Sequence, residues 1–287
     1  MKRATWLHLR IPFSFFLLPV FLFAVSILKH PDWWLVTVIG VILHLFLYPA
    51  SNGYNSYYDK DEGSIGGLKH PPKVSKELYL MALVFDGIAL AVGLWISWQF
   101  AIMLLIYGLV SKAYSHPMIR LKKMPIIGWI TAGFFQGYFT FLMVIVGATQ
   151  FSLPELLTAE VQLPAILSSL LLWGSYPMTQ VYQHEEDAAR GDQTISLKLG
   201  VLGTFHFTAA MFSLSNAGFL AYYYTYFGLT TAIMFQAFML PMLAFFLWWY
   251  TKVRKDEGQA NFGHTMQLNM LSAVMLNGFF LLVALLY

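Results

Sequence analysis

The chain has 287 residues, of which 58% are hydrophobic and 11% charged, and its mean hydropathy is +0.62. A soluble globular domain carries about 25% charged residues, so this composition excludes a soluble particle and indicates a protein embedded in lipid. The net charge of +3 does not suggest nucleic-acid binding, and the absence of cysteine excludes disulfides and cysteine-based metal or redox sites.

Residues 1–30 combine a basic start with an apolar run of about 18 residues, as a secretory signal peptide would. No small-x-small cleavage site follows this run, and the run is long enough to cross a bilayer. We therefore expect a retained first helix.

Further apolar runs, separated by polar or Pro- and Gly-bearing loops, predict membrane-spanning helices along the rest of the chain. The predicted helices lie at 11–28, 34–57, 78–97, 100–115, 125–147, 163–183, 201–222, 229–250 and 265–287. Near 98–100 only Gln99 interrupts the apolar run, so two long helices or one re-entrant hairpin fit that boundary. The expected fold class is an all-α integral membrane protein, a single domain over 1–287 with nine transmembrane helices around a central cavity.

The distribution of basic residues gives a membrane orientation for these helices. If the N-terminus is cytoplasmic, every Lys and Arg except Lys29 falls in a segment on the cytoplasmic side. Because Lys and Arg accumulate in cytoplasmic loops, this predicts nine helices with the C-terminus outside. The longest loop, 58–77, is then cytoplasmic. We expect a multi-pass protein, such as one of the bacterial inner membrane, with its active site at the cytoplasmic rim.

Two polar stretches, 48–63 (YPASNGYNSYYDKDEG) and 176–191 (YPMTQVYQHEEDAARG), end the second and sixth predicted helices. They match without a gap in a Tyr-Pro pair, two amides, a tyrosine, an aspartate and a glycine. Such a match is typical of a parallel internal repeat. The matched positions advance by four, three and four, which is one face of an α-helix, so each stretch should carry a polar stripe. The stripe residues are Asn52, Asn55 and Asp59 in the first copy and Gln180, Gln183 and Asp187 in the second.

Polar residues at a helix end can simply enter water, and intramembrane amides can hydrogen-bond neighbouring helices. Two matched stretches on one membrane face favour a functional site instead. Six of the fourteen acidic residues lie at or next to the ends of the stripes: Asp59, Asp61, Glu62, Glu185, Glu186 and Asp187. Carboxylates this close repel unless a cation lies between them, and oxygen-rich sites of this kind suit Mg²⁺ that also binds a substrate diphosphate.

Basic residues on the same face fit a diphosphate, although each alone is explained as a topology signal near anionic lipid. They are Lys69, Arg120, Lys122, Lys123, Arg190 and Lys198. Lys112 differs because it lies at an apolar boundary near a helix end, close to Tyr114.

At the two motifs the sequence resembles the UbiA family of intramembrane prenyltransferases. The family carries Asn-Asp-x-x-Asp-x-x-x-Asp after its second helix and Asp-x-x-x-Asp after its sixth. Asn55 and Asp59 match the first motif at the family spacing, and Asp187 with Gly191 matches the second. The helix count and the Tyr-Ser-x-Pro turn at 114–117 are also similar, so the resemblance covers nearly the whole chain.

The sequence departs from the family motifs at three positions. Ser56 and Gly63 stand where the first motif has aspartates, and Gln183 stands where the second motif begins with aspartate. Two alternatives follow: either neighbouring acids replace the missing ligands, or metal binding is weaker. The neighbouring acids are Asp61, Glu62, Glu185 and Glu186. The individual ligand assignments therefore stay open.

The resemblance implies that the motifs bind a polyprenyl diphosphate through Mg²⁺ and that a lateral opening admits the lipid tail. Diphosphate departure leaves an allylic cation, which aromatic faces stabilise in a site that excludes water. Tyrosines near the expected site are Tyr54, Tyr57, Tyr58, Tyr138, Tyr176 and Tyr182. A lipophilic acceptor then attacks the cation. Aromatic quinone precursors are the commonest acceptors that the resemblance implies, beside haem, chlorophyll precursors and glycerol lipids.

The two motifs and the family resemblance together predict roles for individual residues. Those expected in catalysis are Asp59, Asp187, Lys112 and Tyr114. Those expected to bind substrate are Asn52, Asn55, Lys69, Arg120, Lys122, Gln180, Gln183 and Arg190. The expected Mg²⁺ ligands are Asp59, Asp61, Glu62, Glu186 and Asp187. Asp192, just after the second motif, is expected to be exposed and outside the site.

Two other classes of function stay open. A transporter or channel needs polar groups through the full depth of the bilayer, whereas the outer halves of the second and sixth predicted helices are mostly apolar. A non-catalytic membrane scaffold is disfavoured by the clustered acids. Diphosphate release from a prenyl diphosphate distinguishes an enzyme from both.

Overall fold

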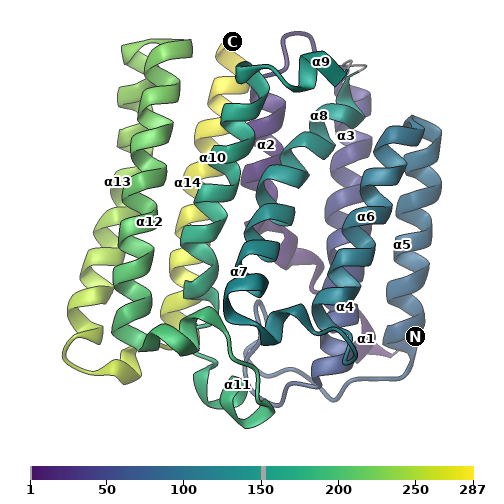
Figure 1. The fold of residues 1–287 in the computed structure, drawn as a ribbon, viewed down its shortest axis with the longest axis vertical. Coiled ribbons are helices and arrows are strands. Elements are labelled where there is room, and N and C mark those ends of the chain that lie inside the picture. Colours follow the sequence, from purple (N-terminus) through teal and green to yellow (C-terminus); the bar gives the residue numbers. More distant parts are fainter. Residues whose placement is uncertain (1, 150–152) are drawn as a thin grey trace.

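The computed structural model describes residues 2–149 and 153–287, and this part of the chain is a bundle of helices joined by turns and loops (Figure 1). Short 3₁₀ or π-helical segments, labelled η, extend or interrupt several helices. In chain order the elements are α1 (Arg3–Leu9), η1 (Ile11–Phe16), α2 (Leu18–Ser26), α3 (Trp33–Val41), η2 (Ile42–Leu47), α4 (Tyr48–Asp59), α5 (Glu77–Ile96), α6 (Trp98–Ser115), η3 (Leu121–Lys123), α7 (Pro125–Gly133), η4 (Phe134–Phe139), α8 (Thr140–Ala148), α9 (Leu153–Leu156), α10 (Ala159–Ser175), η5 (Tyr176–Thr179), α11 (His184–Arg190), α12 (Ile195–Phe227), α13 (Leu229–Val253), η6 (Glu257–Gln259) and α14 (Phe262–Leu286).

Six helical segments in the described part are long and apolar enough to cross a bilayer, and the bent pair Arg3–Phe16 and Leu18–Ser26 would make a seventh. The six are Trp33–Asp59, Glu77–Ile96, Pro125–Ala148, Ile195–Phe227, Leu229–Val253 and Phe262–Leu286. A helix is found at each of the nine predicted places. However, α6 with 18 residues and α10 with 17 do not meet this measure of length and apolarity. The all-helical membrane fold is thus confirmed, and the count of nine spans stays a prediction.

The uncertain boundary near 98–100 is a break between two helices. Ser97 has an extended backbone, and its hydroxyl accepts a hydrogen bond from the amide of Phe100 at 3.1 Å, which caps the start of α6. Helices α5 and α6 then lie side by side along their length (Figure 1). The N-terminus lies toward the same end of the bundle as α11, and the C-terminus lies at the opposite end (Figure 1).

The two motifs share sequence but not backbone conformation. The first is one helix, α4, and its polar stripe ends at Asp59 as predicted. The prediction of a single helical face for the second motif is wrong, because α10 ends at Ser175 and η5 and a turn separate it from α11. Pro177 has no N–H to donate to the carbonyl of Trp173 four residues earlier. That carbonyl instead accepts a bond from Trp129 Nε1 at 2.8 Å.

A glycine allows α10 to pack against the π-helical segment η4. A Cβ on Gly137 would lie 2.5 Å from Ser169 Cα and 2.6 Å from Ser169 N. The close approach also lets Ser169 Oγ accept from Tyr138 N and donate to Gly133 O, both at 2.9 Å. Small residues at helix crossings have this role in membrane proteins, where packing and hydrogen bonds replace the hydrophobic drive.

We predict that Gly137→Ala lowers the free energy of unfolding by about 1–3 kcal/mol, because the added methyl group overlaps the backbone of α10. The measurement is the thermal unfolding midpoint of the detergent-solubilised protein. Gly87→Ala in α5 is the matched control, since a Cβ there meets nothing within 4 Å. Equal midpoints for the two variants would contradict this account of the crossing.

Candidate active site at one end of the bundle

The two motifs meet around a polar cavity of about 120 Å³ at the end of the bundle where α11 lies. The first motif contributes Asp59 at the end of α4 and Asp61 on the following loop. The second contributes Asp187 from α11 and, just beyond the helix, Asp192. Four carboxylates from segments far apart in sequence therefore line one cavity.

Cations from the segment before α7 neutralise part of this charge. Arg120 donates to both oxygens of Asp192, from Nε to Oδ1 and from Nη2 to Oδ2, each at 2.8 Å. The same guanidinium lies 3.4 Å from Asp59 Oδ1. Lys122 donates to Asp59 and lies 3.9 Å from Asp192 Oδ2. These two cations therefore link the first motif to the end of the second.

Arg190 of α11 joins carboxylates of both motifs. It donates to Asp61, and its Nη2 donates to Asp187 Oδ1 at 2.8 Å. Its Nε lies 3.5 Å from Asp192 Oδ2, and its Nη1 lies 3.7 Å from Glu186 Oε1. Lipid and protein interior stabilise a charge poorly, so this pairing is a condition for burying so many acids together.

The expectation that Asp192 is exposed and outside the site is wrong. Its side chain is only 1% exposed and is held by Arg120, 72 residues away in sequence. Burial raises its pKa, but the hydrogen bond from Arg120 and the charges of Lys122, Arg120 and Arg190 outweigh burial and lower the pKa below its ordinary value. Asp192 is therefore an ionised member of the charged cluster.

Asp187 differs from Asp192 in its electrostatics. Burial raises the pKa of Asp187 to about 7, more than the positive charge of Lys122 lowers it, and the charges of Asp192 and Asp59 raise it further. Besides Arg190, its carboxylate accepts a bond from Thr194 Oγ1 at 3.3 Å. The negative charge of Asp187 is therefore unfavourable in this cluster, and an additional cation would stabilise it.

Other residues predicted to bind substrate are divided between the site and the periphery. Asn55, Gln180 and Gln183 line the polar cavity, as do Lys122 and Arg190. Asn52 lines the adjoining cavity instead. Lys69 is exposed and lines neither cavity, and Glu62 is exposed and contacts Glu186 through its backbone N–H.

Lys112 lies away from the motif carboxylates. Its ammonium pairs with Asp86 of α5 and lies 5.3 Å from the centre of the Tyr54 ring. It lines neither the polar cavity nor the adjoining one. Tyr54, Tyr57 and Tyr58 likewise contact Tyr79 on this outer side of α4.

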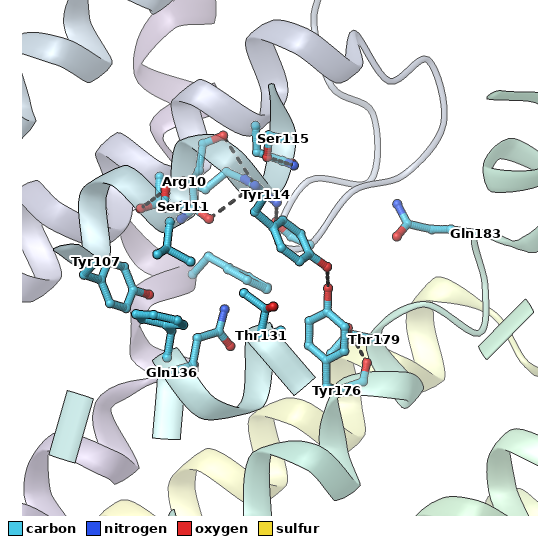
Figure 2. A pocket seen from close by; sticks show the side chains of 18 of the residues that line it. Arg10, Tyr107, Ser111, Tyr114, Ser115, Thr131, Gln136, Tyr176, Thr179 and Gln183 are labelled. Atoms are coloured by element: carbon cyan, nitrogen blue, oxygen red, sulfur yellow. Dashed lines mark hydrogen bonds between the residues drawn. The ribbon is translucent and has the colours of Figure 1, made fainter. Parts of the chain in front are cut away.

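A central cavity of about 220 Å³ continues from the polar cavity into the bundle (Figure 2). Tyr114 of α6 and Tyr176 of η5 lie between the two cavities and line both, and their hydroxyls are hydrogen-bonded to each other (Figure 2). Deeper in, aromatic rings alternate with small polar groups. The deeper lining includes Phe13, Asn52, Tyr107, Ser111, Phe135 and Gln136.

Arg10 is a site residue that the sequence did not single out. Its guanidinium lines both cavities, donating to Asn52 Oδ1 and to Gly66 O, each at 3.3 Å. It forms none of the ion pairs found in the described part of the chain, unlike Arg120, Lys122 and Arg190. A basic residue directly before the first apolar run was the available signal, but it was interpreted only as a topology charge.

A third, more apolar cavity of about 160 Å³ adjoins the central one and shares Phe13, Asn52, Gln136, Tyr176 and Thr179 with it. Its remaining lining comes mainly from α2, α10 and α14. It includes Leu17, Val20, Leu171, Met178, Met242 and Leu276. Charged, mixed and apolar cavities therefore follow one another from the end of the bundle inward.

The chain is similar in sequence and in fold to proteins of known structure. The model of the UbiA prenyltransferase family matches residues 13–272. An apo UbiA homologue from Aeropyrum pernix K1 is 18% identical, with a TM-score of 0.74 over 96% of this chain and 99% of the other. A UbiA homologue from Archaeoglobus fulgidus bound to GPP and Mg²⁺ is 17% identical, with a TM-score of 0.67 over 98% and 100%. The same homologue bound to DMAPP and Mg²⁺ gives 18% identity, a TM-score of 0.68 and 98% coverage of both chains. A comparison with curated proteins found no match.

The contrast between the two buried aspartates gives a stability prediction. Asp192→Asn should lower the free energy of unfolding by about 3–5 kcal/mol, because it removes the buried carboxylate that accepts both hydrogen bonds of Arg120 and leaves that guanidinium only the longer contact with Asp59. Asp187→Asn should leave it unchanged or raise it at pH 8. The folded-state pKa of about 7 lies above the ordinary 3.8, so stability from this group is full below pH 4 and lost as the pH rises to 7. Asn removes that loss. Thermal unfolding without Mg²⁺ at pH 5 and pH 8 is the measurement. Equal destabilisation by both substitutions would contradict the assignment.

Proposed function

The chain belongs to the UbiA prenyltransferase family, and we propose that it transfers a prenyl group from a polyprenyl diphosphate to a lipophilic, aromatic acceptor within the membrane in a Mg²⁺-dependent reaction. The observation that carries this proposal is the sequence of cavities. A charged cavity built from both motifs opens into an aromatic cavity and then into an apolar one. An amphiphile with an anionic head and a hydrocarbon tail matches that gradient.

The polar cavity suits the diphosphate. Arg10, Lys122 and Arg190 line it, and Arg120 lies at its edge through its contacts with Asp59 and Asp192. Guanidinium groups bind phosphate oxygens in bidentate fashion, and Arg10 has no carboxylate partner among the ion pairs described above. We assign it to direct phosphate contact. The paired cations then hold the carboxylates in place as well as attracting the anion.

The acidic residues fit Mg²⁺. Apart from the cationic side chains, the polar groups at the cavity offer oxygen atoms of carboxylates, amides and hydroxyls, the class of metal ligand that Mg²⁺ prefers. Asp59 Oδ1 is buried and makes no hydrogen bond in the described part of the chain. Asp59 and Asp187 would hold the ion, with Asp61 and Glu186 nearby. When bound, Mg²⁺ supplies Lewis-acid stabilisation of the departing diphosphate.

In the transfer, the bond between the allylic carbon and the diphosphate oxygen breaks, and its electron pair leaves with the diphosphate. Tyr114 and Tyr176 lie at the junction between the charged and aromatic cavities, where this carbon would stand. Their hydroxyls can donate to the leaving oxygen, and their rings together with Tyr107 present electron-rich faces to the cation. The surrounding bundle excludes water that would otherwise trap the cation.

The central cavity supports an aromatic acceptor. Phe13, Tyr107 and Phe135 provide ring surfaces, while Ser111 and Gln136 provide groups that hydrogen-bond a phenol or carboxylate. The acceptor carbon attacks the allylic cation and then loses a proton. The gathering of basic residues at the motif end supports placing the site on the cytoplasmic side of the membrane, as in a bacterial inner membrane.

We predict that Asp59→Asn and Asp187→Asn each lower turnover by about 100-fold or more, because each removes a charged ligand from the transition state for diphosphate departure. Asn55→Ala and Gln183→Ala should lower it less, since water replaces a neutral ligand. The assay is release of diphosphate from a radiolabelled prenyl diphosphate by purified protein at limiting Mg²⁺, with an EDTA blank.

Glu185→Gln is the control for these substitutions, because Glu185 lies in the same helix as Asp187 but is exposed and outside the cavity. Its turnover should equal that of the wild type. Wild-type turnover in both Asp59→Asn and Asp187→Asn would refute the proposed diphosphate site. Cation flux in liposomes without diphosphate release would instead indicate a transporter.

The acceptor class is tested by metabolite profiling of a deletion strain. We expect the loss of one prenylated aromatic compound and its return when the wild-type chain, but not Asp59→Asn, is expressed. Loss of a prenylated glycerol lipid or haem with no change in prenylated aromatics would overturn the aromatic assignment and leave prenyl transfer itself intact.

A further inference from the structure

The two motifs contact each other directly, through hydrogen bonds between protein groups. Gln183 Nε2 donates to Ser64 O at 3.0 Å. Glu186 Oε1 accepts from the backbone N–H groups of Glu62 and Gly63 at 3.1 and 3.4 Å. These bonds, together with the pairing of Arg190 and Asp61 described above, form what we call the inter-motif contact: residues 61–64 against Gln183, Glu186 and Arg190.

The departures from the family motifs belong to this contact. A Cβ on Gly63 would lie 2.6 Å from Glu186 Oε2, so the Glu186 carboxylate occupies the space that a side chain at residue 63 would need. An aspartate at 63 is therefore incompatible with the observed position of Glu186. Gln183, likewise, uses its amide to bind the loop of the first motif, where an aspartate would have no proton to donate.

Arg190 is the charged centre of the contact. Its guanidinium pairs with Asp61 from the first motif and with Asp187 and Asp192 from the second, and Glu186 lies 3.7 Å away. Arg190 thus bridges carboxylates of both motifs, as a divalent metal ion bound between them would. A second cation at the same place would be repelled by the guanidinium.

The remaining carboxylates have their own cations. Lys122 pairs with Asp59, and Arg120 pairs with Asp192. Accordingly, the described residues contain no group of three or more acidic or histidine side chains arranged to hold a metal ion by themselves.

We propose that Arg190 takes the place of a second metal ion: it joins the two motifs without metal, and the site takes up a single divalent ion together with the diphosphate. The first half of this inference stands on the protein contacts alone. The second half rests on the proposed function, since it needs a bound prenyl diphosphate.

The first half is tested by the distance between the motifs. The chain has no cysteine, so cysteines introduced at the exposed His70 and Ala189 carry nitroxide spin labels without background. In wild-type background with EDTA we expect one narrow distance distribution that Mg²⁺ leaves unchanged. In Arg190→Ala the distribution should broaden in EDTA. Arg190→Lys should be intermediate, because an ammonium keeps the charge but not the geometry needed to reach several carboxylates.

Arg254→Ala is the matched control for these variants, since it removes an arginine from an exposed position near the end of α13. It should not broaden the distribution. A wild-type distance that changes with Mg²⁺, or an Arg190→Ala distribution as narrow as the wild type in EDTA, would overturn the role of Arg190.

The second half is tested by counting bound ions with Mn²⁺ and geranyl S-thiolodiphosphate, which does not turn over readily. Electron paramagnetic resonance titration should give one Mn²⁺ per chain. Two ions per chain would overturn the inference even if turnover is normal. No bound ion and no turnover would overturn the proposed function and this half of the inference, while the metal-free distances would still decide the role of Arg190.

Discussion

Burial of charge at one end of an apolar bundle is the constraint on which this structure depends. Asp59, Asp61, Asp187 and Asp192 line one cavity, and their side chains are each no more than 7% exposed. Arg120, Lys122 and Arg190 lie among them and offset their negative charge. Each of these cations contacts more than one carboxylate, so removing any one leaves at least two acids with fewer partners. The loops around the cavity are therefore held by charge as much as by packing.

Because charge is buried at one end of the bundle, the polar and apolar side chains line separate cavities. Charged groups stay at the end of the bundle, while the adjoining cavities become aromatic and then apolar. Tyr176 and Thr179 line all three cavities, which makes η5 the segment where head, reacting carbon and tail of an amphiphilic substrate would meet. The break between α10 and α11 therefore affects how the second motif reaches the cavities. A continuous helix through residues 176–187 would place Tyr176 and Asp187 on one face, whereas the turn lets them approach the cavities from different directions.

Comparison of prediction and structure shows where sequence reasoning failed. Asp192 follows a glycine beyond a polar helix, a pattern typical of an exposed loop, and its burial depends on Arg120 from a distant segment. Arg10 was interpreted as a topology charge, and only its position between two cavities shows another role. Lys112 is the opposite case, because it was expected to belong to the site and lies away from it. Its place at an apolar boundary was correctly identified, but its partner is Asp86 of α5, and it lines neither the polar nor the central cavity.

The sequence by itself determined the helical membrane fold, the place of most helices and the pairing of the two motifs, because hydrophobic length and helical periodicity are local properties. It also singled out Asp59 and Asp187 from their matched spacing, which needs no tertiary information. Both line the polar cavity, and their roles in catalysis stay predictions. Only the tertiary structure decided which cation each carboxylate meets, that the second motif is broken, and that Glu186 and Arg190 join it to the first. Ion pairs between segments more than 60 residues apart depend on how the helices pack, and no local pattern in the chain encodes that packing.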